Sequence, residues 1–142
     1  MNAIMTPTAR TEPIRSILVI DDDVQLGIGI KMLLQKHRYL AQATNSGGAA
    51  LRILAKEPFD LVITDIFMED KDGLETIVAI RERHPGMRVI AVSGGSKLVR
   101  FDCLEMAAAL GAETILRKPL TIEALLKAIR ALEEEPVSIV ER

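Results

Sequence analysis

Five short stretches of the chain have the pattern of β-strands, and they alternate with stretches that have the spacing of amphipathic helices. Three of the strands are continuous apolar runs, which is typical of strands that helices cover on both faces. The second is more polar, which favours a place at the edge of a sheet. We expect the strands near 17–20, 39–43, 61–64, 88–92 and 114–116.

The expected helices begin and end at residues that favour helix termini. Ser46 introduces the second helix, and Thr121 is placed to cap the last one. Pro85 stops the third helix, and Gly111 follows the fourth, which we expect over 97–110. Five strand–helix units predict an α/β fold, a doubly wound five-stranded parallel sheet with five helices and right-handed crossovers.

The domain organisation is simple, because 142 residues suit one domain with a real core. Residues 1–15 contain Thr, Pro and Arg without periodicity, so we interpret them as a flexible N-terminal leader. The domain itself is expected over 16–133. Residues 134–142 are expected to form a short C-terminal tail.

Composition excludes several classes of protein. A hydrophobic content of 49% with 27% charged residues is that of an ordinary globular domain. The net charge of −2 gives no reason to expect nucleic acid as a partner. No apolar run approaches the roughly 18 residues of a membrane span, and no signal peptide is recognisable. Cys103 is the only cysteine, which favours a reducing compartment and a cytoplasmic protein.

Reactive polar groups follow four of the five expected strands. Because the carboxyl ends of parallel strands lie along one edge of a sheet, these groups are expected to meet there, in a sheet of the flavodoxin-like order 2-1-3-4-5. Carboxylates, a hydroxyl and an ammonium together suit a Mg2+ ion and a phosphoryl group. The groups are Asp21, Asp22 and Asp23 after the first strand, Asp65 after the third, Ser93 after the fourth and Lys118 after the fifth.

The run of aspartates after the first strand has two interpretations. Asp21 and Asp22 would repel each other and Asp65, and a divalent cation would relieve that repulsion. The alternative is that the run only caps the following helix and interacts with its dipole. One residue suffices for capping, and Asp23 is the best candidate for that role.

Asp65 follows the most apolar strand, where a carboxylate can attack phosphorus and form an aspartyl phosphate. Lys118 could neutralise one phosphate oxygen, and a cis peptide before Pro119 would aim it into the site. Ser93 could donate a hydrogen bond to another phosphoryl oxygen.

As a set, these segments resemble the receiver domain of two-component response regulators. The resemblance covers about 16–132 and depends on the joint order of six short motifs. They are Ile-Leu-Val-Ile-Asp-Asp-Asp at 17–23, Leu-Val-Ile-Thr-Asp-Ile-Phe-Met at 61–68, Asp72-Gly73, Ala-Val-Ser-Gly at 91–94, Gly111-Ala112 and Arg-Lys-Pro at 117–119.

The resemblance implies that Asp65 accepts phosphate from a sensor histidine kinase or a histidine phosphotransfer protein. It implies a Mg2+ ion bound directly by Asp22, through water by Asp21, and by Asp65 and the backbone carbonyl of Phe67. Ser93 takes the place of the switch hydroxyl, and Lys118 that of the phosphate-binding lysine. The domain would switch a binding surface for an unknown downstream protein. It would catalyse only phosphotransfer onto itself and slow autodephosphorylation.

Departures from the family pattern keep alternatives open. Ile115 stands where the family has an aromatic residue that rotates on activation, which leaves room for a degenerate receiver that is a constitutive docking module. A phosphohydrolase of the haloacid-dehalogenase kind would use an Asp-x-Asp start such as Asp21 and Asp23. That family needs a later acidic pair, and nothing acidic follows the fourth strand closely.

Overall fold

Five parallel strands form one sheet in the order β2–β1–β3–β4–β5. The fold is that of a computed structural model, which describes residues 12–66, 68, 73–94, 105 and 108–134. The predicted strand order is therefore confirmed, and the polar second strand does lie at an edge. The strands are β1 (Ser16–Ile20), β2 (Leu40–Thr44), β3 (Leu61–Asp65), β4 (Arg88–Ser93) and β5 (Thr114–Arg117).

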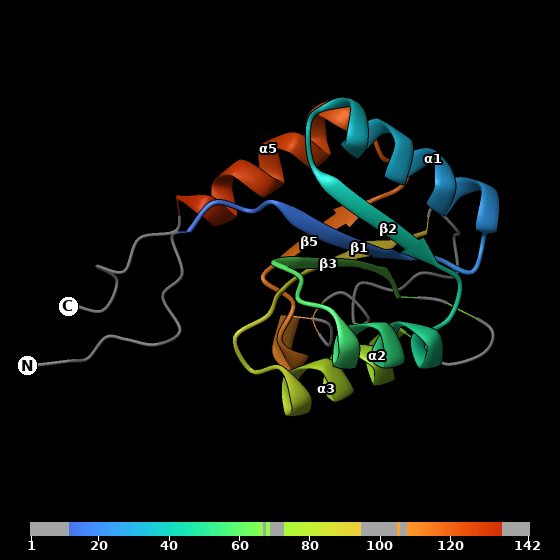
Figure 1. Cartoon of the computed structure of the whole chain (residues 1–142), viewed down its shortest axis with the longest axis vertical. Coiled ribbons are helices and arrows are strands. Elements are labelled where there is room, and N and C mark those ends of the chain that lie inside the picture. Colours follow the sequence, from blue (N-terminus) through green and yellow to red (C-terminus); the bar gives the residue numbers. More distant parts are fainter. Residues whose placement is uncertain (1–11, 67, 69–72, 95–104, 106–107, 135–142) are drawn as a thin grey trace, which may run out of the picture.

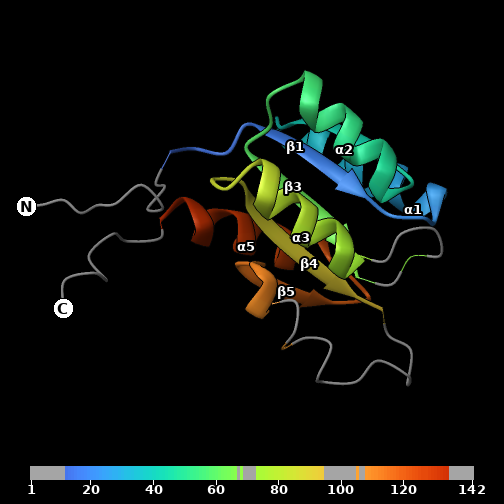
Figure 2. The same ribbon diagram turned by 90° about the horizontal axis from the view of Figure 1, so that it is seen from below.

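Helices cover both faces of the sheet, as a doubly wound fold requires. In Figures 1 and 2, α1 and α5 lie on one face and α2 and α3 on the other. Between β4 and β5, Glu105 and residues 108–110 are helical, and the rest of the helix expected over 97–110 lies outside the described residues. The bounds are α1 (Val24–Lys36), α2 (Gly47–Lys56), α3 (Gly73–Arg83) and α5 (Ile122–Glu133). In the described part of the chain no helix combines the length and apolarity needed to cross a membrane.

The apolar strands are buried on both faces because alternate side chains enter two different cores. Ile17 and Val19 of β1 pack with α1 and α5. Leu18 and Ile20 pack with α2 and α3. Every residue of β3 and β4 is buried, so neither strand shows an alternating pattern in the sequence.

The predicted caps are confirmed. The side chain of Asp23 accepts a hydrogen bond from the backbone N–H of Leu26 at 3.2 Å and so begins α1. Ser46 and Thr121 cap α2 and α5 in the same way, each at 3.1 Å. Gly111 has φ +122°, a left-handed value that favours glycine.

Backbone N–H groups at the start of the domain are bound by acidic side chains. The N–H of Ile14 donates to Oε2 of Glu133 at 2.7 Å, and those of Arg15 and Ser16 donate to Oδ2 of Asp60 at 2.9 and 3.0 Å. The Ile14 side chain is 3% exposed and packs in the core beneath α5. Ile14 and Arg15 thus contact the domain although they fall within the expected leader. The division of the chain at residues 15 and 133 stays a prediction.

A second group of polar contacts, here named the Arg81 cluster, consists of Arg81, Val89, Gly111 and Glu113. The guanidinium of Arg81 donates to the carbonyl of Gly111 at 2.6 Å and to Glu113 Oε1 at 2.9 Å. The same Glu113 oxygen accepts the backbone N–H of Val89 at 2.8 Å. The cluster joins α3 to β4 and to the segment before β5, at the amino ends of the strands.

Candidate functional site

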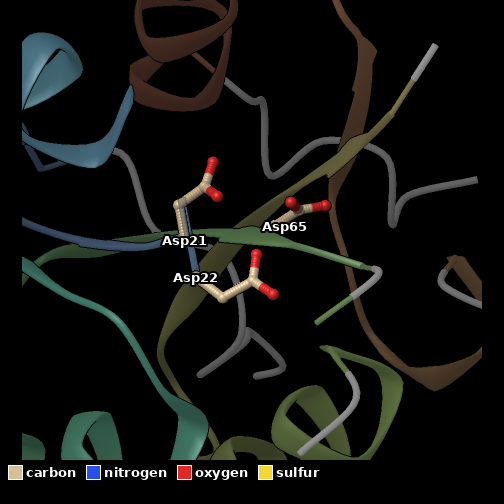
Figure 3. A group of neighbouring side chains, drawn as sticks. All are labelled: Asp21, Asp22 and Asp65. Atoms are coloured by element: carbon tan, nitrogen blue, oxygen red, sulfur yellow. The ribbon is translucent and has the colours of Figure 1, made fainter. Parts of the chain in front are cut away.

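The ends of β1 and β3 bring the predicted carboxylates together. Ile20 of β1 lies opposite Thr64 of β3, so the next residues, Asp21 and Asp65, lie side by side at the carboxyl edge. Figure 3 shows Asp21, Asp22 and Asp65 around a common space. One carboxylate oxygen from each lies within 4.8 Å of the other two.

The three carboxylates differ in their surroundings. Asp21 is 4% exposed and Asp65 is 6% exposed, whereas Asp22 is exposed. Oδ1 of Asp21 accepts the backbone N–H of Asp23 at 2.9 Å. Two buried carboxylates beside a third are unfavourable without a positive charge.

Lys118 supplies one positive charge to this group. Its Nζ lies 3.1 Å from Oδ2 of Asp65 and 3.4 Å from Oδ2 of Asp21. Burial alone would lower the pKa of Lys118, but the attraction of Asp65 and then of Asp21 outweighs it and the pKa is raised. The peptide between Lys118 and Pro119 is cis. The attraction of the two buried carboxylates thus holds the Lys118 ammonium in its charged form.

Ser93 contributes a buried hydroxyl to the same edge of the sheet. It is the last residue of β4 and is fully buried, and within the described part of the chain its Oγ makes no hydrogen bond. Its carbonyl accepts the backbone N–H of Lys118 at 2.9 Å, which links the ends of β4 and β5. A buried hydroxyl without a partner costs free energy, so a ligand oxygen that accepted from it would be stabilised.

The donor set fits Mg2+. Among the described residues of this group, three carboxylates face one ammonium, which leaves an excess of negative charge. Carboxylate oxygens are ligands that Mg2+ prefers, and it retains several waters beside them. The expected fourth ligand, the carbonyl of Phe67, lies outside the described residues.

Ile115 and Gly73 are two further positions near the site. Ile115 is partly buried against the core beneath α2 and α3, where its aliphatic side chain stands in place of an aromatic one. Gly73 begins α3, and its N–H donates to the carbonyl of Ile66 at 2.8 Å. The sequence contains Gly73 only as part of a motif, and its contact with the residue after Asp65 depends on tertiary structure.

A doubly wound parallel sheet that gathers carboxylates, a lysine and a serine at its carboxyl edge places this chain among α/β domains with a ligand site at the strand ends. The model of the response regulator receiver domain family matches residues 17–130. The chain belongs to this family. It is therefore a receiver domain and not a conventional enzyme, which separates it from the haloacid-dehalogenase phosphohydrolases.

Known proteins similar to this chain are regulators and receivers. The transcriptional regulatory protein CpxR of Escherichia coli K12 is 34% identical over 116 residues, which are 82% of this chain and 48% of CpxR. The regulatory protein VirG of Agrobacterium fabrum is 32% identical over 131 residues, 92% of this chain and 51% of VirG. The chain thus spans about half the length of these curated relatives.

A solved structure agrees with the fold. The crystal structure of a response regulator receiver domain protein from Clostridium thermocellum matches with a TM-score of 0.77 at 32% identity, over 85% of this chain and 95% of that one. Receiver domains have histidine kinases as partners, and an acidic triad such as Asp21, Asp22 and Asp65 is typical of their Mg2+ site.

Proposed function

We propose that this chain is a phosphorylation-gated switch in a two-component phosphorelay, with Asp65 as the phosphoacceptor. The donor is a sensor histidine kinase or a histidine phosphotransfer protein, and we place the reaction in the cytoplasm. One observation carries the proposal. Carboxylate oxygens of Asp65, Asp21 and Asp22 lie within 4.8 Å of one another, and the Lys118 ammonium lies 3.1 Å from Asp65.

Asp65 is the proposed nucleophile because its buried carboxylate is held by an ammonium at the end of a rigid strand. One of its oxygens would bond to phosphorus while the bond between phosphorus and the donor histidine nitrogen breaks. That nitrogen retains the electron pair, and the histidine leaves as neutral imidazole after protonation. Lys118 would stand beside the phosphoryl oxygens that carry negative charge in the transition state.

The proposed metal ligands are Asp22 directly, Asp21 through water, Asp65, and the backbone carbonyl of Phe67. The exposure of Asp22 supports its direct role, and Asp21 already accepts the N–H of Asp23 at 2.9 Å. Mg2+ bound there would neutralise phosphoryl oxygens and relieve the repulsion among the carboxylates.

Ser93 is the proposed link between phosphorylation and output. Its Oγ would donate to a phosphoryl oxygen, and its carbonyl already holds the N–H of Lys118 at 2.9 Å. Movement of Ser93 would therefore reach β5 and change a protein-binding surface for an unidentified downstream protein. Because Ile115 is aliphatic, this change proceeds without an aromatic rotation. Free-energy differences of a few kcal/mol suffice to shift such a population.

The proposal is tested by labelling with acetyl phosphate or a phosphorylated kinase, with and without EDTA. The wild type should acquire one label that hydroxylamine removes, as an acyl phosphate requires, and EDTA should prevent it. Asp65→Asn should acquire none, whereas the distant Asp60→Asn should be labelled normally. Label on Asp65→Asn, or label that resists hydroxylamine, would contradict the assignment of Asp65.

A constitutive docking module is the second candidate, and Ile115 is the observation that favours it. Hydrogen exchange with and without beryllofluoride separates the two functions. A switch changes protection between Ser93 and Ile115 when beryllofluoride binds, whereas a docking module has the same protection in both conditions.

A further inference from the structure

Gly73 has no side chain to react, yet it lies closer to the backbone of the proposed acceptor than any other residue type would allow. A Cβ placed on Gly73 would meet Ile66 Cα at 2.5 Å and the Ile66 carbonyl oxygen at 2.7 Å, and the carbonyl oxygen of Asp65 would be closer still. Real Cβ atoms do not approach backbone atoms so closely. The N–H of Gly73 also donates to the Ile66 carbonyl at 2.8 Å.

We infer that Gly73 is a positioning residue for Asp65, because its lack of a side chain lets the first turn of α3 lie directly against the acceptor's backbone. The inference rests on the proposed function and names a further residue of the same site. Gly73 has no side chain that could bind the phosphoryl group or the metal, and it acts through the peptide of Asp65.

Position 73 requires glycine because there is no room for a side chain, and not because its backbone has a conformation that only glycine adopts. Among the described glycines only Gly111 has a φ in the left-handed region. The atoms that a Cβ at position 73 would meet belong to the backbone at the end of β3, so no side-chain rotation can make room. Either α3 moves away from the sheet or the peptides of Asp65 and Ile66 turn.

Turning these peptides would change the direction of the Asp65 carboxylate. Moving α3 would break the hydrogen bond from Gly73 N–H to the Ile66 carbonyl, which holds the chain directly after Asp65. That carboxylate now lies 3.1 Å from the Lys118 ammonium and within 4.8 Å of the oxygens of Asp21 and Asp22. The end of β3 has little freedom to compensate, because Ile66 N–H donates to the Val92 carbonyl at 2.9 Å. The contact at Gly73 therefore sets the geometry on which metal binding and phosphorylation depend.

The test compares Mg2+ binding by calorimetry, beryllofluoride binding by 19F NMR, and acetyl phosphate labelling in Gly73→Ala and the wild type. Loss of a group that orients metal ligands typically lowers metal affinity ~10–100-fold, and we expect Gly73→Ala to weaken Mg2+ binding by that factor. Gly29→Ala is the matched control, because a Cβ there has nothing within 4 Å. Ile80→Val is the structural control, because Ile80 is a fully buried residue of the same helix.

Urea unfolding of each variant separates positioning from stability. Gly73→Ala should lose Mg2+ affinity at temperatures where it is fully folded, whereas Ile80→Val should lose stability and keep its affinity. If Gly73→Ala is unfolded in buffer, the same titrations are run in trimethylamine N-oxide, which favours the compact state. Equal Mg2+ affinity in folded Gly73→Ala and wild type would overturn the inference. Failure of the wild type to be labelled on Asp65 would instead overturn the proposed function.

Discussion

The two edges of the sheet use the same residue types in opposite ways. At the amino edge, the acidic side chains of Asp60, Glu113 and Glu133 each accept hydrogen bonds from backbone N–H groups, at 2.7–3.0 Å. At the carboxyl edge, Asp21, Asp22 and Asp65 face one another, with Lys118 as the cation between two of them. Acidic groups at the first edge connect separate segments of the chain, whereas those at the second face one another, although Asp21 also accepts the backbone N–H of Asp23.

The difference shows how a structural acid can be told from one that is available for chemistry. An acid whose oxygens meet N–H groups lowers the free energy of the folded state. Carboxylates that meet other carboxylates raise that free energy unless a cation or ligand joins them. The described part of the carboxyl edge also holds the buried, unpartnered hydroxyl of Ser93. Facing carboxylates and a buried hydroxyl without a hydrogen bond are unfavourable by themselves, and they are typical of a site that binds a ligand.

The largest expected effect comes from removing one acid at each edge. Asp22→Ala should weaken Mg2+ binding by ~10-fold or more, and more completely than Asp21→Ala, because it removes a proposed direct ligand. Without Mg2+, the same variant should change the free energy of unfolding by less than ~0.5 kcal/mol, because the Asp22 side chain is exposed.

Asp60→Ala is the control for that prediction and should behave in the opposite way. It leaves the N–H groups of Arg15 and Ser16 without their acceptor, which should cost about 1 kcal/mol, and it should bind Mg2+ normally. Calorimetry and urea unfolding measure both quantities. A loss of stability in both variants would break the contrast between the edges.

A smaller change is expected in the Arg81 cluster. Arg81→Ala removes hydrogen bonds to Gly111 and Glu113, and it should lower the free energy of unfolding by about 1–2 kcal/mol, since the ion pair is partly exposed. Mg2+ affinity should not change, because the cluster lies at the other edge. Weaker Mg2+ binding in the folded variant would show that the two edges are coupled.

Alkaline pH should weaken the attraction between Lys118 and the carboxylates at the carboxyl edge. The folded-state pKa of Lys118 is raised above its ordinary value of 10.5, so its contribution to stability is complete below pH 10.5 and is lost as the pH rises through the folded value. The stability difference between wild type and Lys118→Met should therefore shrink above that pH, by under ~1 kcal/mol. A constant difference across this range would mean that the ammonium contributes nothing.

Ser93→Ala should have the smallest effect on stability. The Oγ of Ser93 has no partner in the described structure, so its removal should change the free energy of unfolding by less than ~0.5 kcal/mol. The beryllofluoride-dependent change in hydrogen exchange should nevertheless disappear. A large loss of stability would imply that this hydroxyl is already bonded in the free protein.

Much of the sheet and of the site could be predicted because both depend on local patterns and one topological rule. Continuous apolar runs give buried strands, and parallel strands bring their carboxyl ends to one edge. These two facts place Asp21, Asp65 and Lys118 together without knowledge of any distance. The N-cap pattern likewise separates Asp23 from its two neighbours.

Other features could not be predicted, because they depend on distances between segments remote in sequence. Arg81 meets Glu113 only after α3 has packed beside the segment that leads into β5. The requirement for glycine at position 73 arises from backbone atoms of Asp65 and Ile66. Ile14 stands among Thr, Pro and Arg residues without periodicity, and only the folded core reveals that it is buried.

The hydrogen bond between Ile14 and Glu133 has a topological consequence. Near the two ends of the described part of the chain, the N–H of Ile14 donates to Glu133 at 2.7 Å. The start of β1 and the end of α5 accordingly lie close together, away from the carboxyl edge (Figure 1). A short peptide linker could therefore join Glu133 to Ile14, and new chain termini could be introduced in a loop elsewhere in the domain. Proteins whose ends adjoin tolerate such circular permutation and insertion into a host protein. If the domain were inserted into a reporter protein, both connections would lie near Ile14 and Glu133, and the acidic site would lie at the opposite edge of the sheet.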